Sequence, residues 1–239
     1  MVDEDVLEEP ARRFHSLDLR AQRIDPVLDD SSIAPAESAR HPGLAAVVEG
    51  ARFIRRRPAL QGAYLIDVNA TVFGLPRALF PALARSAFTG GASTLGFLYA
   101  APAAGALIGA LGTGWLDRVR RRGRAVVAAV CVWGAAIAAF GLVHVLWLAL
   151  GLLAVAGWAD VTSAVLRNTI LQTSVPEGFR SRIASVQMAV VEGGPRLGDL
   201  EAGGVAAAVS PQFSIVSGGL ACIAGALVVA ALLPGFRDA

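Results

Sequence analysis

Long runs of apolar residues, separated by short clusters of charge, form the dominant pattern along this chain of 239 residues. A helix that crosses a bilayer needs roughly 20 mostly apolar residues. Five runs meet this length, and a sixth is shorter but uncharged. The predicted helices cover residues 60–84, 94–116, 125–142, 145–173, 183–210 and 214–233. Breaks such as Gly90-Gly91 and Ser210-Pro211 separate them, so the pattern predicts an all-α membrane protein with six transmembrane helices.

The chain before these helices has a different pattern. Residues 1–43 are rich in Asp, Glu, Arg and Ser and lack a helical apolar period, which predicts a polar, disordered tail without a cleavable signal peptide. In residues 44–57, apolar positions at helical spacing run into three consecutive arginines. This favours a short interfacial helix on the cytoplasmic surface, with a solvated linker helix as the alternative. Residues 58–239 then form the predicted transmembrane lobe.

Composition supports this division. Apolar residues make up 55% of the chain and charged residues 17%, with a mean hydropathy of +0.58. A soluble domain carries about a quarter charged residues, so the apolar excess needs contact with lipid. Cys131 and Cys222 are solitary within apolar runs, and neither a metal site, a cofactor fingerprint nor a nucleophile-and-base constellation is recognisable. We therefore expect no cofactor, no metal and no enzymatic activity.

Arginines near the helix ends predict the orientation in the membrane. They gather before the first predicted helix (Arg52, Arg55, Arg56, Arg57), between the second and third (Arg118, Arg120, Arg121, Arg122, Arg124), between the fourth and fifth (Arg180, Arg182) and after the sixth (Arg237). The opposite loops offer Arg85 alone. Because short basic loops stay in the cytoplasm, both termini are predicted to be cytoplasmic, in a bacterial cell membrane. Topology also explains the basic cluster at 118–124, so no nucleic-acid partner is expected.

Polar residues inside the first predicted helix are candidates for a substrate or proton cavity. Asp67 lies about 10 Å from the start of that helix at 1.5 Å per residue, and Asn69 and Arg77 follow it. A carboxylate at this depth can take up a proton, or it can form a buried ion pair with an arginine that fixes helix packing. In the fourth helix, Asp160 and Arg167 share a face. We expect Arg167 to lie near the surface as a snorkelling or loop-pairing residue, with a substrate ligand as the alternative.

The fifth predicted helix is the most polar. Glu192, Arg196 and Asp199 share one face, and the Gly-Gly-Pro sequence at 193–195 predicts a helix break between them. Arg196 can neutralise one acid and leave the other free to take up protons, which would suit a cavity; an internally neutralised structural triad is the alternative. In the second helix, Gly105 and Gly109 are spaced to let a neighbouring helix approach closely.

One loop resembles a known family signature. Residues 113–122 are similar to the Gly-x-x-x-Asp-Arg-x-Gly-Arg-Arg motif that joins the second and third helices of each lobe in the major facilitator superfamily. Asp117, Arg118, Arg121 and Arg122 match, whereas Thr113 and Arg120 replace its glycines. Residues 49–58, 167–182 and 192–203 are further similar to the C-terminal half of the enterobactin-exporter-like and macrolide-efflux-like branch.

The resemblance implies one six-helix lobe of a two-lobed fold, with the substrate path between the lobes. It implies a secondary, proton-coupled exporter of a siderophore, macrolide or other amphipathic small molecule. Its expected partners are the lipid bilayer, that small molecule, and a second copy of the chain or a separately encoded N-terminal lobe. The alternative is a truncated or split-gene membrane protein without transport activity of its own.

Overall fold

A computed structural model gives the fold and describes residues 44–74, 77–88 and 90–237, with the side chains of residues 44–46, Trp115 and Asp117 left out. The predicted polar tail at 1–43 lies outside this part. Every regular element in the described ranges is a helix. They are α2 (Leu44–Ile54), α3 (Pro58–Phe73), η2 (Arg77–Leu79), α4 (Phe80–Ser86), α5 (Ala92–Leu111), η3 (Thr113–Arg118), α6 (Arg122–Leu142), α7 (Leu146–Ser174), η4 (Glu177–Phe179), α8 (Arg180–Ala208), α9 (Pro211–Leu232) and α10 (Pro234–Arg237).

Local sequence sets several of these boundaries. Pro58 opens α3 and Pro211 opens α9, each at a position where its missing N–H leaves no partner unsatisfied. The Ser210 side chain caps α9 by accepting a hydrogen bond from the Phe213 N–H at 3.1 Å. Helix ends therefore fall where proline and capping residues place them.

Four helices in the described part are long and apolar enough to cross a membrane: α5, α6, α7 and α9. The other two predicted spans differ for physical reasons. α3 has 16 residues, fewer than a span needs, and α8 has 29 residues but carries six charged side chains. The chain is thus an all-α protein with at least four membrane-length helices, and membrane crossing by α3 and α8 belongs to the proposal below.

Two predicted features are wrong in detail. The expected helix at 60–84 is interrupted, since α3 ends at Phe73 with Gly74 as its C-cap and a short 3-10 turn precedes α4. The expected break at 193–195 is absent, because α8 runs on through Pro195. Gly194 and Gly198, on either side of Pro195, lie close against Thr71 and Val72 of α3.

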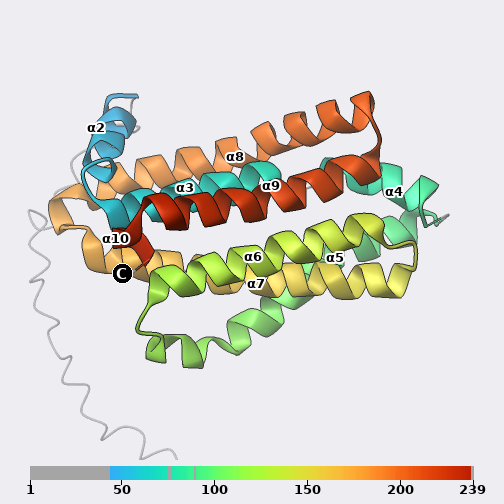
Figure 1. The fold of residues 1–239 in the computed structure, drawn as a ribbon, viewed down its shortest axis with the longest axis horizontal. Helices are drawn as coiled ribbons and strands as arrows, with labels where there is room; N and C mark the ends of the chain where they lie inside the picture. The colour runs from blue at the N-terminus through green and yellow to red at the C-terminus, as the bar shows by residue number, and fades with distance from the viewer. Residues whose placement is uncertain (1–43, 75–76, 89, 238–239) are drawn as a thin grey trace, which may run out of the picture. The chain divides into compact units, whose positions relative to one another are not determined.

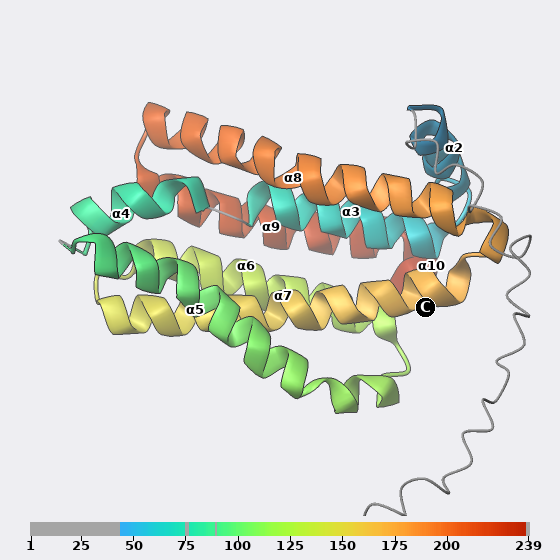
Figure 2. The same ribbon diagram turned by 180° about the vertical axis from the view of Figure 1, so that it is seen from behind.

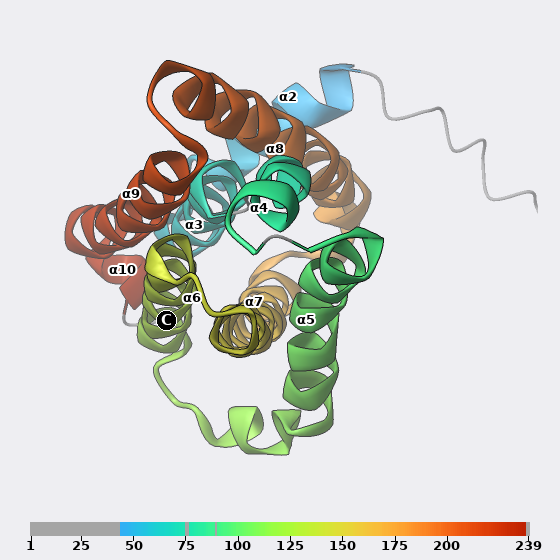
Figure 3. The same ribbon diagram turned by 90° about the vertical axis from the view of Figure 1, so that its right-hand side faces the viewer.

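The helices of residues 44–237 lie in two groups (Figures 1 and 2). α8, α3 and α9 lie on one side, and α6, α7 and α5 lie on the other, as the view along the helices also shows (Figure 3). α6 packs on both α7 and α9, and α5 packs on α7. α3 packs on α8 and α9. The two groups therefore meet chiefly through α6 and α9, and α3 adds contacts to α7 and α6.

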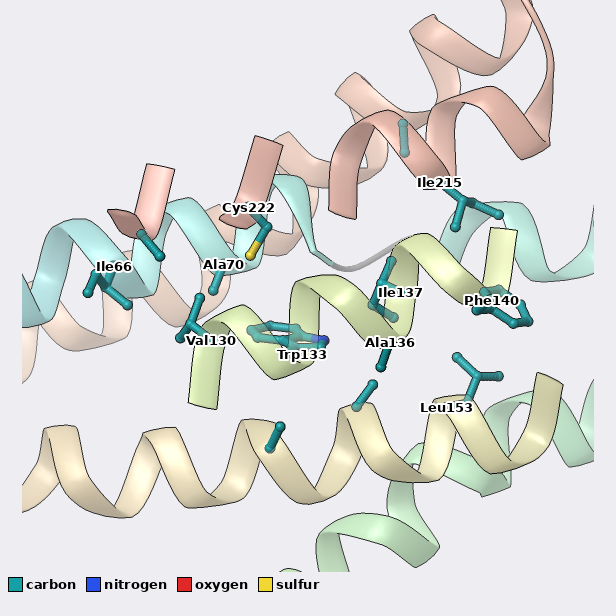
Figure 4. Packing of buried hydrophobic residues seen from close by; sticks show 14 of the residues in the cluster. Ile66, Ala70, Val130, Trp133, Ala136, Ile137, Phe140, Leu153, Ile215 and Cys222 are labelled. Atoms are coloured by element: carbon teal, nitrogen blue, oxygen red, sulfur yellow. The ribbon is translucent and has the colours of Figure 1, made fainter. Parts of the chain in front are cut away.

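Apolar side chains from both groups meet around α6 (Figure 4). Trp133, Ile137 and Phe140 of α6 are each at most 4% exposed. They pack with residues of α3, α7 and α9 in one buried cluster, which includes Ile66 and Cys222. Burying such side chains contributes about 1.5–3 kcal/mol each in water, although within a membrane it is close packing that stabilises the contact.

Glycines permit the closest helix contacts. A Cβ atom at Gly105 of α5 would collide with the backbone carbonyl of Ala154 in α7, and one at Gly157 of α7 would collide with that of Pro102. Gly109 lies against Trp158 in the same interface. The prediction that Gly105 and Gly109 form a helix-packing face is therefore confirmed.

Candidate functional site

Asp67 occupies a buried position in the third turn of α3, facing α7 and α8. It is 7% exposed. One carboxylate oxygen lies 2.9 Å from the Arg167 guanidinium of α7. The other accepts a hydrogen bond from the side-chain amide of Gln187 in α8 at 3.3 Å. Three helices that are far apart in sequence thus meet at a single carboxylate.

Arg167 is buried rather than near the surface, so the expectation of a snorkelling or loop-pairing residue is wrong. It is 8% exposed, and its Nη2 faces Asp67. Its Nη1 has no hydrogen-bond partner within the described residues, and neither has the hydroxyl of Ser163 one turn earlier. A buried guanidinium with an unused donor can bind a further acceptor, such as a water molecule or an anionic oxygen of a ligand.

This cluster lines a cavity of about 240 Å³. The charged and polar members are Tyr64, Asp67, Arg167, Asn168 and Gln187, and Ala63, Ala164, Leu171 and Val191 complete the wall. Charged groups in an apolar bundle normally face a partner or an aqueous cavity, and Asp67 has a charged partner and lines a cavity. The site can bind a proton on its carboxylate and a polar group on its guanidinium.

A second cavity continues this one toward the α7–α8 connection. It has a volume of about 390 Å³ and shares Tyr64, Leu171 and Gln187 with the first. Its far wall includes Val175 and Arg180, which stand beside η4. The Tyr64 hydroxyl donates to the Ile183 carbonyl at 3.3 Å, which holds this aromatic side chain between the two cavities. The two cavities are therefore neighbours that share wall residues, and Asp67 lines the first of them.

Arg77 and Asp160 line a separate small cavity of about 40 Å³ with Trp133 and Pro102. Its volume suits a water molecule rather than a larger ligand. Asp160 lies seven residues before Arg167 on the same face of α7. A line of ionisable side chains thus follows α7 from Arg167 to Asp160 and on to Arg77.

Asn69 does not face the cavity of Asp67. Its side-chain amide donates to the Cys222 carbonyl of α9 at 2.8 Å, and Gly225 leaves room for it. The amide thus ties α3 to α9. Within the described structure this is a packing contact, and a role in transport stays a prediction.

The candidate cavity residues on α8 do not face the cavity of Asp67. Glu192, Arg196 and Asp199 are exposed, on the side of α8 opposite to the glycines that touch α3. The Glu192 carboxylate and the Arg196 guanidinium are 3.8 Å apart, with side chains 62% and 82% exposed. The structure does not bring these residues together with Asp67, and the face they form has no cover within the described residues.

The loop residues of the predicted motif lie between α5 and α6. Arg118 and Arg121 are exposed and Arg122 is half-buried. The side chain of Asp117 lies outside the described part.

Two residues of the site were not predicted from the sequence: Arg167 as the partner of Asp67, and Gln187 altogether. The polar character of the fourth helix could have indicated that Arg167 belongs to a buried site. A single glutamine in an apolar run gives no such indication for Gln187.

The helical fold and the four helices long and apolar enough to cross a membrane define an all-α membrane protein of helical-bundle type. The family model for transmembrane secretion effectors matches residues 31–238. The chain belongs to this family, within the major facilitator superfamily. It is thus a multi-pass membrane protein of the enterobactin-exporter-like branch.

Curated relatives agree with this placement. The chain is 33% identical over 208 residues to the enterobactin exporter EntS of Escherichia coli O139:H28 (strain E24377A / ETEC), covering 87% of this chain and 49% of that protein. The same values hold for the enterobactin exporter EntS of Shigella boydii serotype 18 (strain CDC 3083-94 / BS512). The chain therefore spans about half the length of the curated relatives it matches. No solved structure matches it.

Proposed function

We propose that this chain forms one six-helix lobe of a proton-coupled efflux transporter. Its cargo would be an amphipathic small molecule, such as a siderophore or a macrolide, and the second lobe would come from another copy or from a separate chain. The supporting observation is the buried Asp67–Arg167 pair at 2.9 Å, which lines a cavity. The similarity to enterobactin exporters supports the class of cargo.

In this proposal α3 with α4, and α8, cross the membrane beside the four apolar helices. Their charges argue for a location away from lipid, since each charged side chain at mid-membrane costs about 2.5–3.5 kcal/mol on insertion scales. The exposed Glu192, Arg196 and Asp199 of α8 would then face the other lobe or the aqueous path between lobes. The arginine clusters would place both chain termini in the cytoplasm.

The geometry of the pair supports the proposed proton coupling. When Asp67 takes up a proton, its carboxyl group loses its charge and no longer neutralises Arg167. An unpaired buried guanidinium costs about 3–5 kcal/mol, which favours a rearrangement that gives Arg167 a new partner. The anionic or polar group of a cargo molecule in the adjoining cavity can be that partner. Release of the proton would restore the pair and displace the cargo.

The proposal is tested by flux in proteoliposomes that contain the full chain and carry a pH gradient, with enterobactin and a macrolide as cargo. We expect gradient-driven flux from the wild-type chain and at least a tenfold loss in Asp67→Asn, because the amide cannot exchange a proton. Glu177→Gln is the matched control, since Glu177 is an exposed acid in η4 outside the cavity. Equal flux in Asp67→Asn and wild type would contradict proton coupling at this site.

A second possibility is a membrane protein of this family without transport activity of its own. It is favoured by the coverage of about half of each relative, because one lobe leaves a wall of the path open. Light scattering of the detergent-solubilised chain, with the detergent mass subtracted, separates the two. A stable dimer supports a two-copy transporter. A monomer without flux, alone or with a separately expressed partner lobe, supports the second possibility.

A further inference from the structure

The short helix α2 packs on the start of α8. The Glu49 carboxylate lies 3.0 Å from the Arg182 guanidinium, and the rings of Phe53 and Phe179 stack at 4.5 Å between centroids. Gly50 lets the α2 backbone approach the carbonyl of Arg182 closely. These contacts fix the position of α2 across the ends of α3 and α8.

A groove of about 250 Å³ is left where α2, α3 and α8 meet. Its walls are almost entirely apolar, and they are formed by Ala51, Ile54, Tyr64, Leu65, Val68, Val186 and Val190, with Arg55 and Gln61 as the two other members. Leu65 and Val68 are 46% and 38% exposed, so the groove is open along its length. Gln61, Leu65 and Val68 follow one face of α3 over about 10 Å.

The polar members stand together at one end. Arg55 immediately follows α2 and Gln61 lies in the first turn of α3, whereas the far end is bounded by Val68 and Val190. The groove therefore has a cationic end and an aliphatic body. This is the layout that complements an anionic amphiphile.

The charged residues around Arg55 leave its guanidinium available to bind an anionic group. Glu49 is the one acidic residue between Leu44 and Pro58, and it is already paired with Arg182. Arg57 donates to the Ser174 carbonyl at 2.9 Å and lies over the Phe53 ring. No carboxylate of the described residues pairs with Arg55. Clusters of arginine at the start of a membrane helix attract anionic lipid headgroups.

We propose that this groove binds an anionic phospholipid, with one acyl chain along α3 and α8 and the phosphate on Arg55. Gln61 can donate a second hydrogen bond to the same headgroup. A partner helix is a poorer fit, because a helix is about 10–12 Å wide and the groove extends for only about 10 Å along α3. The bound lipid would fill the space between α2, α3 and α8 and stabilise their arrangement. The proposal does not depend on transport activity.

The test is lipid binding to the full chain in detergent, measured by thermal unfolding with added dioleoyl phosphatidylglycerol or dioleoyl phosphatidylcholine. We expect phosphatidylglycerol to raise the melting temperature more than phosphatidylcholine, and glycerol phosphate without acyl chains to have no effect. Arg55→Gln should weaken phosphatidylglycerol binding about fivefold, the effect of one arginine near a lipid surface. Val68→Trp should weaken binding of both lipids by filling the groove without changing charge.

Matched controls separate this site from general surface charge. Arg56→Gln removes the same charge from the next residue, which lines a different hollow with Phe179. Ala189→Trp adds the same ring to an exposed position of α8 outside the groove. Both should bind phosphatidylglycerol as the wild type does. The proposal is overturned if either control weakens binding as much as its partner variant, if phosphatidylcholine stabilises equally, or if glycerol phosphate alone gives the full shift.

Discussion

The α5–α7 and α6–α9 interfaces differ sharply from the place where α3, α7 and α8 meet. In the first two, glycine backbones touch the facing helix, as Gly105 does at Ala154 and as Gly134 and Gly219 do toward each other. In the third, a carboxylate, a guanidinium and an amide take the place of close apolar contact. Apart from a cavity of about 40 Å³ beside Pro102 and Gly157, the first two interfaces are closely packed, whereas the third holds a cavity of about 240 Å³.

This difference indicates which parts of the bundle are fixed and which can rearrange. Close packing between helices has a single good arrangement, because any shift causes clashes or voids. An ion pair beside a cavity has alternative arrangements, since protonation or a ligand can exchange one partner for another. Substitutions that change one region at a time test this contrast.

The largest effect is expected from breaking the buried pair on one side. Arg167→Met leaves Asp67 buried without its cation, and this should lower the free energy of unfolding by about 3–5 kcal/mol. The measurement is thermal unfolding of the detergent-solubilised chain. Asp67→Leu combined with Arg167→Met removes both charges, and this double variant should recover most of the lost stability. If the double variant is as unstable as Arg167→Met alone, the loss of stability does not come from leaving the Asp67 carboxylate unpaired.

A smaller but clear loss should follow from enlarging a glycine in a packed interface. Gly105→Leu forces α5 away from α7, and overpacking of this kind costs about 1–3 kcal/mol. Gly96→Leu is the control on the same helix, because Gly96 has open space around it. The melting temperatures of the two variants should therefore diverge, with Gly96→Leu at or above the wild-type value. Equal losses in both would mean that α5 is sensitive to bulk in general.

The smallest effect is expected on the exposed face of α8. Glu192→Gln should change the stability of the chain in detergent by at most about 0.5 kcal/mol, since an exposed i,i+4 pair contributes little. The same thermal unfolding experiment measures this. A loss above 1 kcal/mol would show that this face is covered when the chain is solubilised, for example by a second copy.

Much of the helical framework could be predicted from the sequence because membrane helices are recognisable by their length and hydropathy. The limits of α6, α7 and α9 fall within a few residues of those expected. The errors lie at prolines and glycines. The expected helix at 60–84 ends early at Phe73, with Gly74 as its C-cap, whereas the break expected at 193–195 is absent because α8 continues through Pro195. Neighbouring helices decide whether a proline ends a helix in a bundle.

The candidate site was predictable only in part. Asp67 stood out as a lone carboxylate in an apolar helix, and an ion pair with an arginine was one of two interpretations. Its partner was not identified, because Arg167 is a hundred residues away and near a predicted helix end. Glu192 and Arg196 were correctly expected to share a helix face, but periodicity gives no information on what that face meets.

The sequence by itself determined that this protein is a bundle of apolar helices with basic connections and that it resembles the major facilitator superfamily. Hydropathy and short motifs are local properties, because they depend only on residues that are close together in the sequence. Only the tertiary structure decided that Asp67, Arg167 and Gln187 meet, that the charges of α8 point away from them, and that α2 leaves a groove ending at Arg55. These facts depend on how each helix is rotated about its axis, and that rotation is set by packing against its neighbours.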